Sequence, residues 1–375
     1  MSFSRIKNPK MINLCYEKAK DVIKKCSTKN GLFASAGKDG YDAVWARDSI
    51  ISFLGASLVK NALFKNTFRR SLITLSENQS SKGQIPNAVD KFSKRKPHVD
   101  YQSIDSSLWF IIGHYAYKKR YKDNSLFNKH KKEIKKALLW LEYQDTGEKG
   151  MLTQLPTSDW QDAFPHKYGY TINTQALYYN VLNLVGEKKK AERLRLMANE
   201  NGDTRLWDDR FYLAYRWKNH NKYKEIGTWF DTLGNLLAIV FGLADRKKAE
   251  RILSYIGKNK INEPYPVKAI YPPIRKGSKE WQDYFEDCDA RKPYNYLNGG
   301  IWTFIGAFYV LSLIKLRKFE KAEIELKKLA EANIEGNFPE WINPITKENF
   351  GRLQAWNAGM YILAYESFKK KKCLI

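Results

Sequence analysis

The sequence predicts an all-α fold, an (α/α)6 barrel in which a ring of inner helices lies inside a ring of outer helices. Three observations favour it: helical periodicity of the apolar residues dominates the 375-residue chain, twelve helices can be counted, and successive helices alternate in character. A helix that is apolar on all sides must be buried, whereas an amphipathic helix keeps one face in water. We expect the helices at about 9–27, 47–60, 61–78, 102–121, 125–144, 171–186, 188–201, 231–244, 245–259, 298–316, 318–335 and 352–371.

The odd-numbered helices of this series are amphipathic. In the ninth, Ala249, Ile252, Leu253 and Ile256 follow the helical spacing i, i+3, i+4, i+7 and are surrounded by Lys, Arg and Glu. The fifth and eleventh have similar faces rich in Lys and Glu. We expect these helices to form the outer ring.

The even-numbered helices are apolar around their whole circumference, most clearly at 231–244, 298–316 and 352–371. We expect them to form the inner ring. An α-solenoid is the alternative, but a solenoid needs a sequence repeat and none is visible. Between the seventh and eighth helices Thr204–Trp217 is strand-like, which predicts a small β-hairpin insertion. Residues 1–375 are expected to form a single barrel domain.

Composition excludes several classes of protein. The 11 Trp, 23 Tyr and 19 Phe exclude a disordered chain, and four scattered cysteines with no CxxC pair argue against structural zinc and a disulfide scaffold. The longest apolar run, 301–314, is shorter than the roughly 20 residues of a membrane span. Met1–Arg5 lead into a polar helix rather than a signal peptide. We expect a soluble, cytoplasmic protein without a membrane partner.

The net charge of +25, from 65 Lys and Arg against 40 Asp and Glu, raises the question of a nucleic-acid partner. The lysines are spread over many helix faces, and no RNA-binding aromatic motif or zinc finger accompanies them. We therefore expect a solvated basic surface and no nucleic-acid partner. The sequence sets no oligomeric state.

Polar and aromatic residues gather in the six segments that lead into the even-numbered helices. If the inner helices run parallel, these segments meet at one end of the barrel, where helix N-termini add backbone N–H donors. That end would be lined with Trp, Tyr, carboxylates, amides and Arg. The segments are 44–48, 99–105, 158–162, 229–232, 294–300 and 337–341.

Such a lining suits a sugar, because aromatic rings stack on its apolar face while carboxylates and amides bind its hydroxyls. Hydrolysis of a glycosidic bond needs two carboxyl groups on opposite sides of that bond. Asp162 and Glu340 are the best candidates, since each lies in a loop rich in Trp and Pro. The sequence contains no nucleophile elbow, phosphate loop or His/Cys/Asp constellation, so we expect no metal or organic cofactor.

Several other candidates are explained as well by structural roles. Asp159 is as readily a loop carboxylate as a functional one, and Arg47 and Asp48 could simply pair with each other. N-capping is the structural alternative for Asp105, Asp231 and Asn298. Burial in the core is the alternative for Trp45, Trp109, Trp302 and Trp356.

At these residues the chain resembles six-hairpin glycosidases over most of its length. Four segments are similar to the amylo-1,6-glucosidase part of glycogen debranching enzymes: Trp45–Ser52, Tyr101–Phe110, Asp159–Ala163 and Asn173–Tyr179. Three later segments are similar to the alkaline/neutral invertases: Asn298–Trp302, Phe338–Trp341 and Gln354–Gly359.

The resemblance implies an inverting α-glycosidase that releases glucose from α-glucans or malto-oligosaccharides. In those families the Asp that matches Asp162 is the general acid, and the Glu that matches Glu340 is the partner carboxylate, here expected to be the base. The chain has no counterpart of the glucanotransferase region of debranching enzymes, so the implied activity is the glucosidase half. The residues expected to bind the sugar are Trp45, Arg47, Asp48, Asp105, Asp159, Trp160, Gln175, Asn298, Trp341 and Trp356.

Three alternatives stay open. The first is hydrolysis of sucrose, as by an invertase. The second is a sugar epimerase on the same barrel, although such enzymes use histidines for proton transfer and the five here are spaced unhelpfully. The third is a non-catalytic protein that binds carbohydrate or nucleic acid, which would be retained on heparin or DNA in a salt-dependent way.

Overall fold

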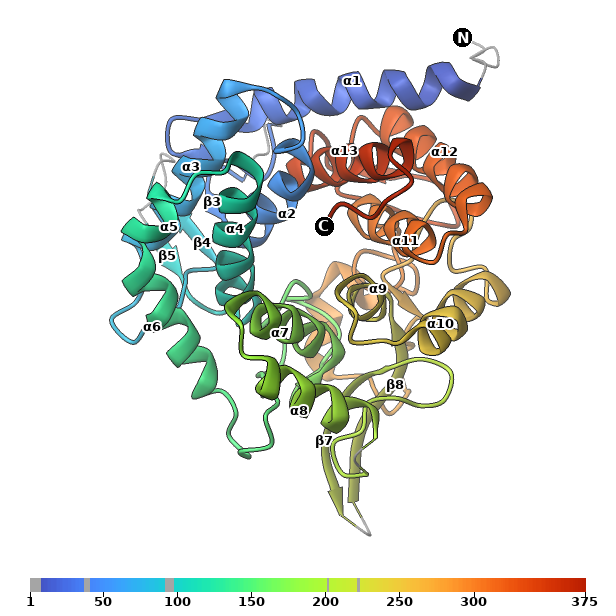
Figure 1. The fold of residues 1–375 in the computed structure, drawn as a ribbon. Coiled ribbons are helices and arrows are strands. Elements are labelled where there is room, and N and C mark those ends of the chain that lie inside the picture. The colour runs from blue at the N-terminus through green and yellow to red at the C-terminus, as the bar shows by residue number, and fades with distance from the viewer. Residues whose placement is uncertain (1–7, 37–40, 92–97, 201, 221–222) are drawn as a thin grey trace.

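Figure 1 shows two concentric rings of helices, with one long two-stranded hairpin and several short strands. The computed structural model describes residues 8–36, 41–91, 98–200, 202–220 and 223–375. The expectation about Met1–Arg5 therefore lies outside the described residues.

Six helices form the inner ring. Each packs against the next along the chain, and the last packs against the first, which closes the ring. The predicted all-round burial is confirmed, since nearly every residue of the last two is buried. The six are α2 (Ala46–Ala56), α4 (Asp105–Tyr121), α7 (Ile172–Val185), α9 (Thr232–Phe241), α11 (Thr303–Lys315) and α13 (Ala355–Lys369).

Two glycines allow the ring to close between α2 and α13. A Cβ added at Gly55 would collide with the carbonyl oxygen of Gly359, and one added at Gly359 would collide with the backbone of Ser52. The two helix backbones therefore approach so closely that no side chain fits between them at these positions.

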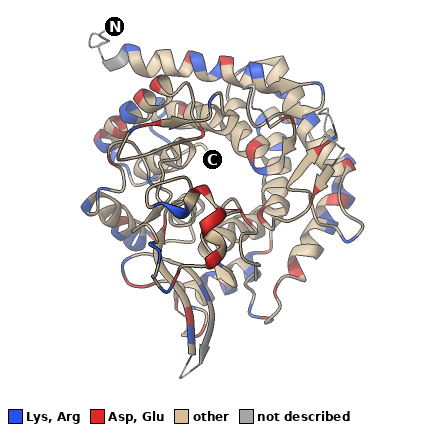
Figure 2. Ribbon diagram, turned by 180° about the vertical axis from the view of Figure 1, so that it is seen from behind, with Lys and Arg blue, Asp and Glu red and all other residues tan. Residues whose placement is uncertain are grey.

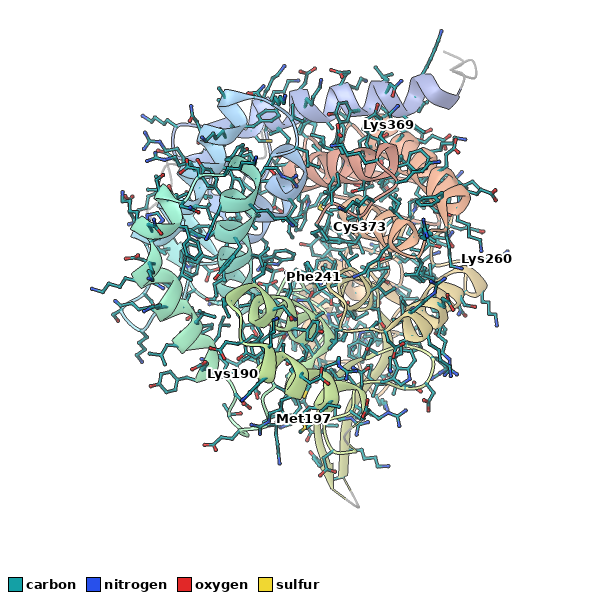
Figure 3. The ribbon with its side chains drawn as sticks, viewed as in Figure 1. Lys190, Met197, Phe241, Lys260, Lys369 and Cys373 are labelled. Carbon is teal, nitrogen blue, oxygen red and sulfur yellow. The ribbon has the colours of Figure 1, made fainter. Side chains whose placement is uncertain are left out.

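The outer ring covers the inner one, as the amphipathic pattern predicts. In Figure 3, Lys190 and Lys260 lie at the outer rim, whereas Phe241 lies toward the centre. Basic and acidic residues are interspersed along these outer helices (Figure 2). The outer helices are α1 (Asn8–Cys26), α3 (Ala62–Glu77), α5 (Ser125–Lys129), α6 (Lys131–Glu142), α8 (Lys188–Asn199), α10 (Arg246–Lys258) and α12 (Phe319–Glu335).

The single helix expected over 125–144 is in fact two, because the chain leaves helical geometry at His130 (φ −101°, ψ 20°). The buried ring of His130 lies 3.1 Å from that of His114 on α4, Nδ1 to Nε2. At the break, a polar contact therefore connects the outer ring of helices to the inner one.

The described residues contain more β-structure than one hairpin. The predicted hairpin is present, but its strands are β7 (Leu213–His220) and β8 (Tyr223–Asp231), later than the strand-like stretch Thr204–Trp217 suggested. They belong to a four-stranded antiparallel sheet with β6 (Tyr170–Thr171) and β9 (Ile270–Tyr271).

The remaining strands are two or three residues long, too short for an alternating pattern to be visible in the sequence. They form a three-stranded sheet and two small antiparallel pairs, and two 3-10 helices accompany them. Their bounds are β1 (Ser27–Thr28), β2 (Gly31–Leu32), β3 (Val44–Trp45), β4 (Ala88–Asp90), β5 (His98–Asp100), β10 (Trp341–Ile342), β11 (Asn349–Phe350), η1 (Asp283–Asp287) and η2 (Asp289–Arg291).

Three strands run directly into inner helices: β3 into α2, β6 into α7 and β8 into α9. Hydrogen bonding to neighbouring strands therefore fixes the chain just before each of these helices begins. This is the end of the barrel at which the polar segments were expected to meet.

No helix in the described part of the chain is both long enough and apolar enough to cross a bilayer. The four cysteines, Cys15, Cys26, Cys288 and Cys373, are free.

Candidate active site

A cavity lies at the end of the barrel where the inner helices begin. Its lining comes from the segments that lead into α2, α7, α11 and α13, from the first turns of α2 and α13, and from two residues in the stretch before β3. The lining residues are Ala34, Tyr41, Trp45, Arg47, Asp48, Trp160, Asp162, Tyr296, Trp302, Glu340, Gln354 and Trp356.

Aromatic rings form the walls of this cavity. Trp160 and Trp356 both meet Trp302 edge-on, with ring centroids 5.6 and 5.7 Å apart. Among the described residues, none accepts a hydrogen bond from the indole N–H of Trp45, Trp160 or Trp356. Buried donors of this kind normally have a partner. The walls therefore present apolar ring faces, on which a sugar ring can stack, and their buried indole N–H groups have no partner among the described residues.

Arg47 joins two of the predicted carboxylates. Its guanidinium donates to Asp105 Oδ1 at 3.1 Å and to Asp162 Oδ2 at 3.3 Å, and it also donates to Ser103 Oγ at 2.7 Å. Burial alone would lower the pKa of Arg47, but the two carboxylates outweigh it and raise that pKa. Arg47 thus bridges Asp105 and Asp162, and the alternative of a simple ion pair with Asp48 is not the arrangement found.

We expect Arg47→Met to lower the apparent free energy of unfolding by about 3–5 kcal/mol, because it leaves the fully buried Asp105 carboxylate unpaired. Urea denaturation followed by circular dichroism measures this. The double variant Arg47→Met/Asp105→Asn should recover much of the loss, since it removes the unpaired charge as well. Unchanged stability of the single variant would contradict this account of the bridge.

The carboxyl of Asp162 is accessible from the cavity, with 42% of its side-chain surface exposed, although the surrounding protein replaces much of its water. This desolvation raises the pKa of Asp162, and Arg47 offsets part of the rise. A carboxyl with a raised pKa can carry a proton at higher pH than an ordinary aspartate.

Glu340 faces the same cavity from the segment just before β10. Burial raises the pKa of its carboxyl to about 7, and a hydrogen bond from the Tyr41 hydroxyl to Oε1, at 3.2 Å, partly opposes the rise. Asp48 is the third carboxyl in the lining, and burial raises its pKa to about 6. Three acidic groups with perturbed pKa values in one cavity are typical of a catalytic site.

Tyr41→Phe tests how the Glu340 carboxylate is stabilised. A hydrogen bond to the ionised form lowers a carboxyl pKa, so its loss should raise the pKa of Glu340 above about 7. If Glu340 must be ionised for activity, the acidic limb of the kcat/KM profile moves to higher pH. Above that limb the loss should stay within about tenfold, the value of one hydrogen bond. An acidic limb that stays in place or moves to lower pH would contradict the role of Tyr41.

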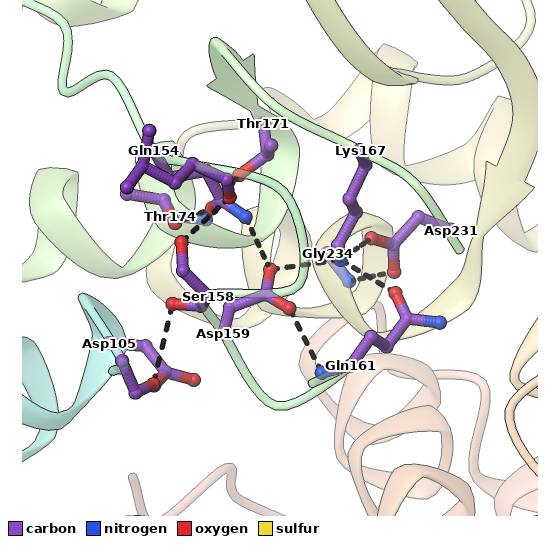
Figure 4. A network of polar contacts seen from close by, with 12 residues as sticks. Asp105, Gln154, Ser158, Asp159, Gln161, Lys167, Thr171, Thr174, Asp231 and Gly234 are labelled. Carbon is purple, nitrogen blue, oxygen red and sulfur yellow. Dashed lines mark hydrogen bonds and ion pairs between the residues drawn. The ribbon is translucent and has the colours of Figure 1, made fainter. Parts of the chain in front are cut away.

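Asp159, predicted from the sequence to bind the sugar, does not line the cavity. Its carboxylate is fully buried and forms an ion pair with Lys167 Nζ at 3.0 Å. Lys167 Nζ also donates to Asp231 Oδ2 at 2.8 Å (Figure 4). Asp231 in turn caps α9 by accepting from Gly234 N, so its N-cap alternative is the correct one.

Gln175 and Asn298 also lie outside the cavity lining, because the backbone uses their side-chain amides. Gln175 bonds the N–H and the carbonyl of Leu152, and Asn298 bonds the N–H and the carbonyl of Ile274. The lining therefore does not support the sugar contacts predicted for these two residues. Asn298 does not cap a helix either, since α11 begins only at Thr303.

Asp105 and Trp341 lie one layer behind the lining. Asp105 reaches the cavity only through Arg47, and its place as the first residue of α4 gives it no capping bond. The ring of Trp341 stacks on that of Phe350, with the two ring centroids 3.9 Å apart, and contacts Tyr296 edge-on. Direct contact of either residue with the sugar is therefore not supported by the lining.

The predictions from the sequence did not single out Tyr41, Tyr296 and Lys167. Tyr296 lies in a segment, 294–300, whose aromatic and amide residues had already marked it. Tyr41 and Lys167 gave no such signal, because their roles come from contacts with Glu340 and Asp231, which are remote in the chain. Within the described ranges, no three His, Cys, Asp or Glu side chains converge as metal ligands would.

Comparison with known protein families shows to which family the chain belongs. The model of the family described as amylo-alpha-1,6-glucosidase matches residues 17–362, which is most of the chain. The chain belongs to the amylo-alpha-1,6-glucosidase family. The resemblance to this family stated from the sequence is thereby confirmed.

Curated relatives match a shorter stretch. Neutral/alkaline invertase 1, mitochondrial, of Oryza sativa subsp. japonica is 28% identical over 139 residues, 36% of this chain and 22% of that protein. Alkaline/neutral invertase E, chloroplastic, of Arabidopsis thaliana is 29% identical over 142 residues, 36% and 22% respectively. The match thus spans about a fifth of these invertases.

Solved structures share the fold of this member of the amylo-alpha-1,6-glucosidase family over nearly its whole length. A GH63 mannosylglycerate hydrolase from Thermus thermophilus has a TM-score of 0.69 at 13% identity and covers 93% of this chain and 99% of its own. A structure described as a wild-type glycosidase has a TM-score of 0.71 at 14% identity, over 98% and 100%. The (α/α)6 barrel is therefore confirmed.

Proposed function

We propose that this protein is an inverting α-glucosidase that releases glucose from α-glucans or malto-oligosaccharides, with Asp162 as general acid and Glu340 as general base. The observation that carries the proposal is that these two carboxyls, from distant parts of the chain, line one aromatic-walled cavity. The family match supports a glucosidase, and the cavity supplies the chemistry that such an enzyme needs.

The reaction follows from the two carboxyl groups. Asp162, protonated, gives its proton to the glycosidic oxygen as the bond to the leaving sugar breaks. Glu340, ionised, takes a proton from a water molecule that attacks the anomeric carbon on the opposite face, and the configuration at that carbon inverts. Inversion requires the carboxyls to be about 6.5–9.5 Å apart, whereas about 5–5.5 Å would favour retention.

The rest of the lining would hold the terminal sugar. The rings of Trp45, Trp160 and Trp356 offer apolar faces, and Asp48 offers a carboxylate acceptor to hydroxyl groups. Arg47 keeps Asp162 in place from behind. We further propose that residues 1–375 act as one catalytic domain and that the enzyme works in the cytoplasm, where free cysteines are usual.

A substrate panel tests the proposal. The purified protein is incubated with isomaltose, maltose, panose, trehalose and sucrose, and released reducing sugar is measured. Cleavage of maltose, isomaltose and panose is expected, with isomaltose and panose reporting activity on α-1,6 bonds. The second candidate, supported by the invertase matches, predicts cleavage of sucrose alone. Hydrolysis of none of these substrates would contradict the proposed substrate class.

A further inference from the structure

We infer that Lys167 is a positioning residue for the general acid: it fixes the loop that carries Asp162 to the starts of two inner helices. The inference rests on the function proposed for Asp162. Lys167 does not line the cavity, so it acts on the reaction only through its neighbours.

The ammonium group of Lys167 uses all of its donors inside the protein. Its side chain is fully buried, and Nζ reaches Gln161 Oε1 at 2.6 Å, Asp231 Oδ2 at 2.8 Å and Asp159 Oδ2 at 3.0 Å. A lysine ammonium has three N–H bonds, which match these three acceptors. Burial opposes its charge, but Asp159 and Asp231 outweigh burial and raise the pKa of Lys167, so it remains a cation.

Two of the three acceptors lie in the acid-bearing loop itself. Asp159 Oδ1 also accepts from the backbone N–H of Gln161, at 2.9 Å, which closes a turn around Trp160. Asp162 follows this turn directly. The cation therefore holds the loop on both sides of a cavity-wall tryptophan and immediately before the proposed acid.

The other contacts connect the loop to the barrel (Figure 4). Asp231 caps α9 through Gly234 N at 3.1 Å. Gln154 donates to Asp159 Oδ2 at 3.3 Å and accepts 2.6 Å hydrogen bonds from the hydroxyls of Thr171 and Thr174 at the start of α7. Through Lys167 and Asp159 the loop is thus tied to the first turns of both α7 and α9.

The proposed acid depends on this support, because its own side chain has little. Asp162 is 42% accessible, and its carboxylate is held by the 3.3 Å contact with Arg47. Besides this contact, the backbone that precedes Asp162 sets its position. A displacement of about 1 Å can cost a catalytic group about 100-fold in rate.

A pair of substrates separates positioning of the acid from general damage. A natural α-glucoside needs a proton on its leaving oxygen, whereas α-glucosyl fluoride releases fluoride with little need for one. Both need the Glu340 base. A misplaced acid should therefore slow the natural substrate selectively, and a merely destabilised protein should lose both activities together.

The test uses the full chain with Lys167→Met/Asp231→Asn. This double variant removes the cation and one carboxylate and so keeps the net charge of the cluster. We expect kcat on the α-glucoside that wild type hydrolyses fastest to fall about 100-fold, with KM and fluoride hydrolysis within about threefold of wild type. Gln161→Leu, which breaks one of the three bonds and changes no charge, should show a smaller fall with the same selectivity.

Lys268→Met is the matched control. Lys268 is also buried, but its Nζ donates to the backbone carbonyls of Lys260 and Glu263, away from the acid loop. It should show no selectivity between the two substrates. Equal losses on both substrates, or no loss, in the double variant would overturn the inference. If the double variant does not fold, unselective behaviour of Gln161→Leu overturns it.

Failure of the proposed function would look different. In that case Asp162→Asn itself would not discriminate between the glucoside and the fluoride, or wild type would act on neither. Asp162→Asn could instead slow the glucoside but not the fluoride, while the variant at Lys167 slows both equally. This result would support Asp162 as the acid and reject only the positioning role of Lys167.

Discussion

Asp162→Asn is expected to lower kcat on an α-glucoside by about 10²–10⁴-fold, the usual contribution of a general acid. The carboxamide has nearly the same size but cannot give a proton to the leaving oxygen. Stability should change little, because the side chain is partly accessible and loses only a charge contact with Arg47. Initial rates on the preferred glucoside and thermal unfolding measure the two effects.

Substrate choice makes this prediction sharper. Hydrolysis of α-glucosyl fluoride by Asp162→Asn should stay within about tenfold of wild type, since fluoride leaves with little acid assistance. Asp21→Asn, an exposed aspartate paired with Lys24 on α1, is the control and should change neither rate. A variant at Asp162 that turns over the glucoside at a near-normal rate would remove the acid role.

Glu340→Gln is expected to lower kcat on both substrates by about 10²–10⁴-fold, because an amide cannot take the proton from the attacking water. The contrast with Asp162→Asn is the test: fluoride should rescue the acid variant and not the base variant. In wild type, protonation of Glu340 below its pKa of about 7 should produce the acidic limb of the kcat/KM profile. This limb should be absent from the residual activity of Glu340→Gln.

Glu348→Gln is the matched control for this second prediction. It lies in the stretch between β10 and β11, close to Glu340 in sequence but exposed. Its rates and pH profile should equal those of wild type. If Glu340→Gln keeps its activity on α-glucosyl fluoride, the base must be another carboxyl in the lining, and Asp48 is the remaining one.

Much of the fold could be predicted because the amino-acid composition of each helix indicates whether it belongs to the inner or the outer ring. Helices of the inner ring are apolar all round and those of the outer ring are amphipathic. This difference is visible in the sequence of each helix, without knowing which helices it packs against. The break at His130 could not be predicted, since the contact made there is with His114 on another helix. The short strands could not be predicted either, because two or three residues are too few to show the alternation of apolar and polar side chains that is typical of a strand.

The site was predicted in outline and less well in detail. The segments before the inner helices could be found because Trp, Tyr and carboxylates are unusual there. The same residue types also serve the backbone at helix starts, so Gln175, Asn298 and Asp159 could not be told apart from sugar ligands by type alone. The structure distinguishes these three residues from the cavity lining: they are buried, and their polar atoms bond to Leu152, Ile274 and Lys167, respectively.

The anomer released first is the most direct test of the central claim, that Glu340 activates water across the cavity from Asp162. Proton NMR follows the hydrolysis of the preferred α-glucoside at a rate faster than mutarotation. The account predicts that β-glucose appears first and then equilibrates with the α-anomer. Initial release of α-glucose would mean retention, and Glu340 could then not act as the base of an inverting reaction.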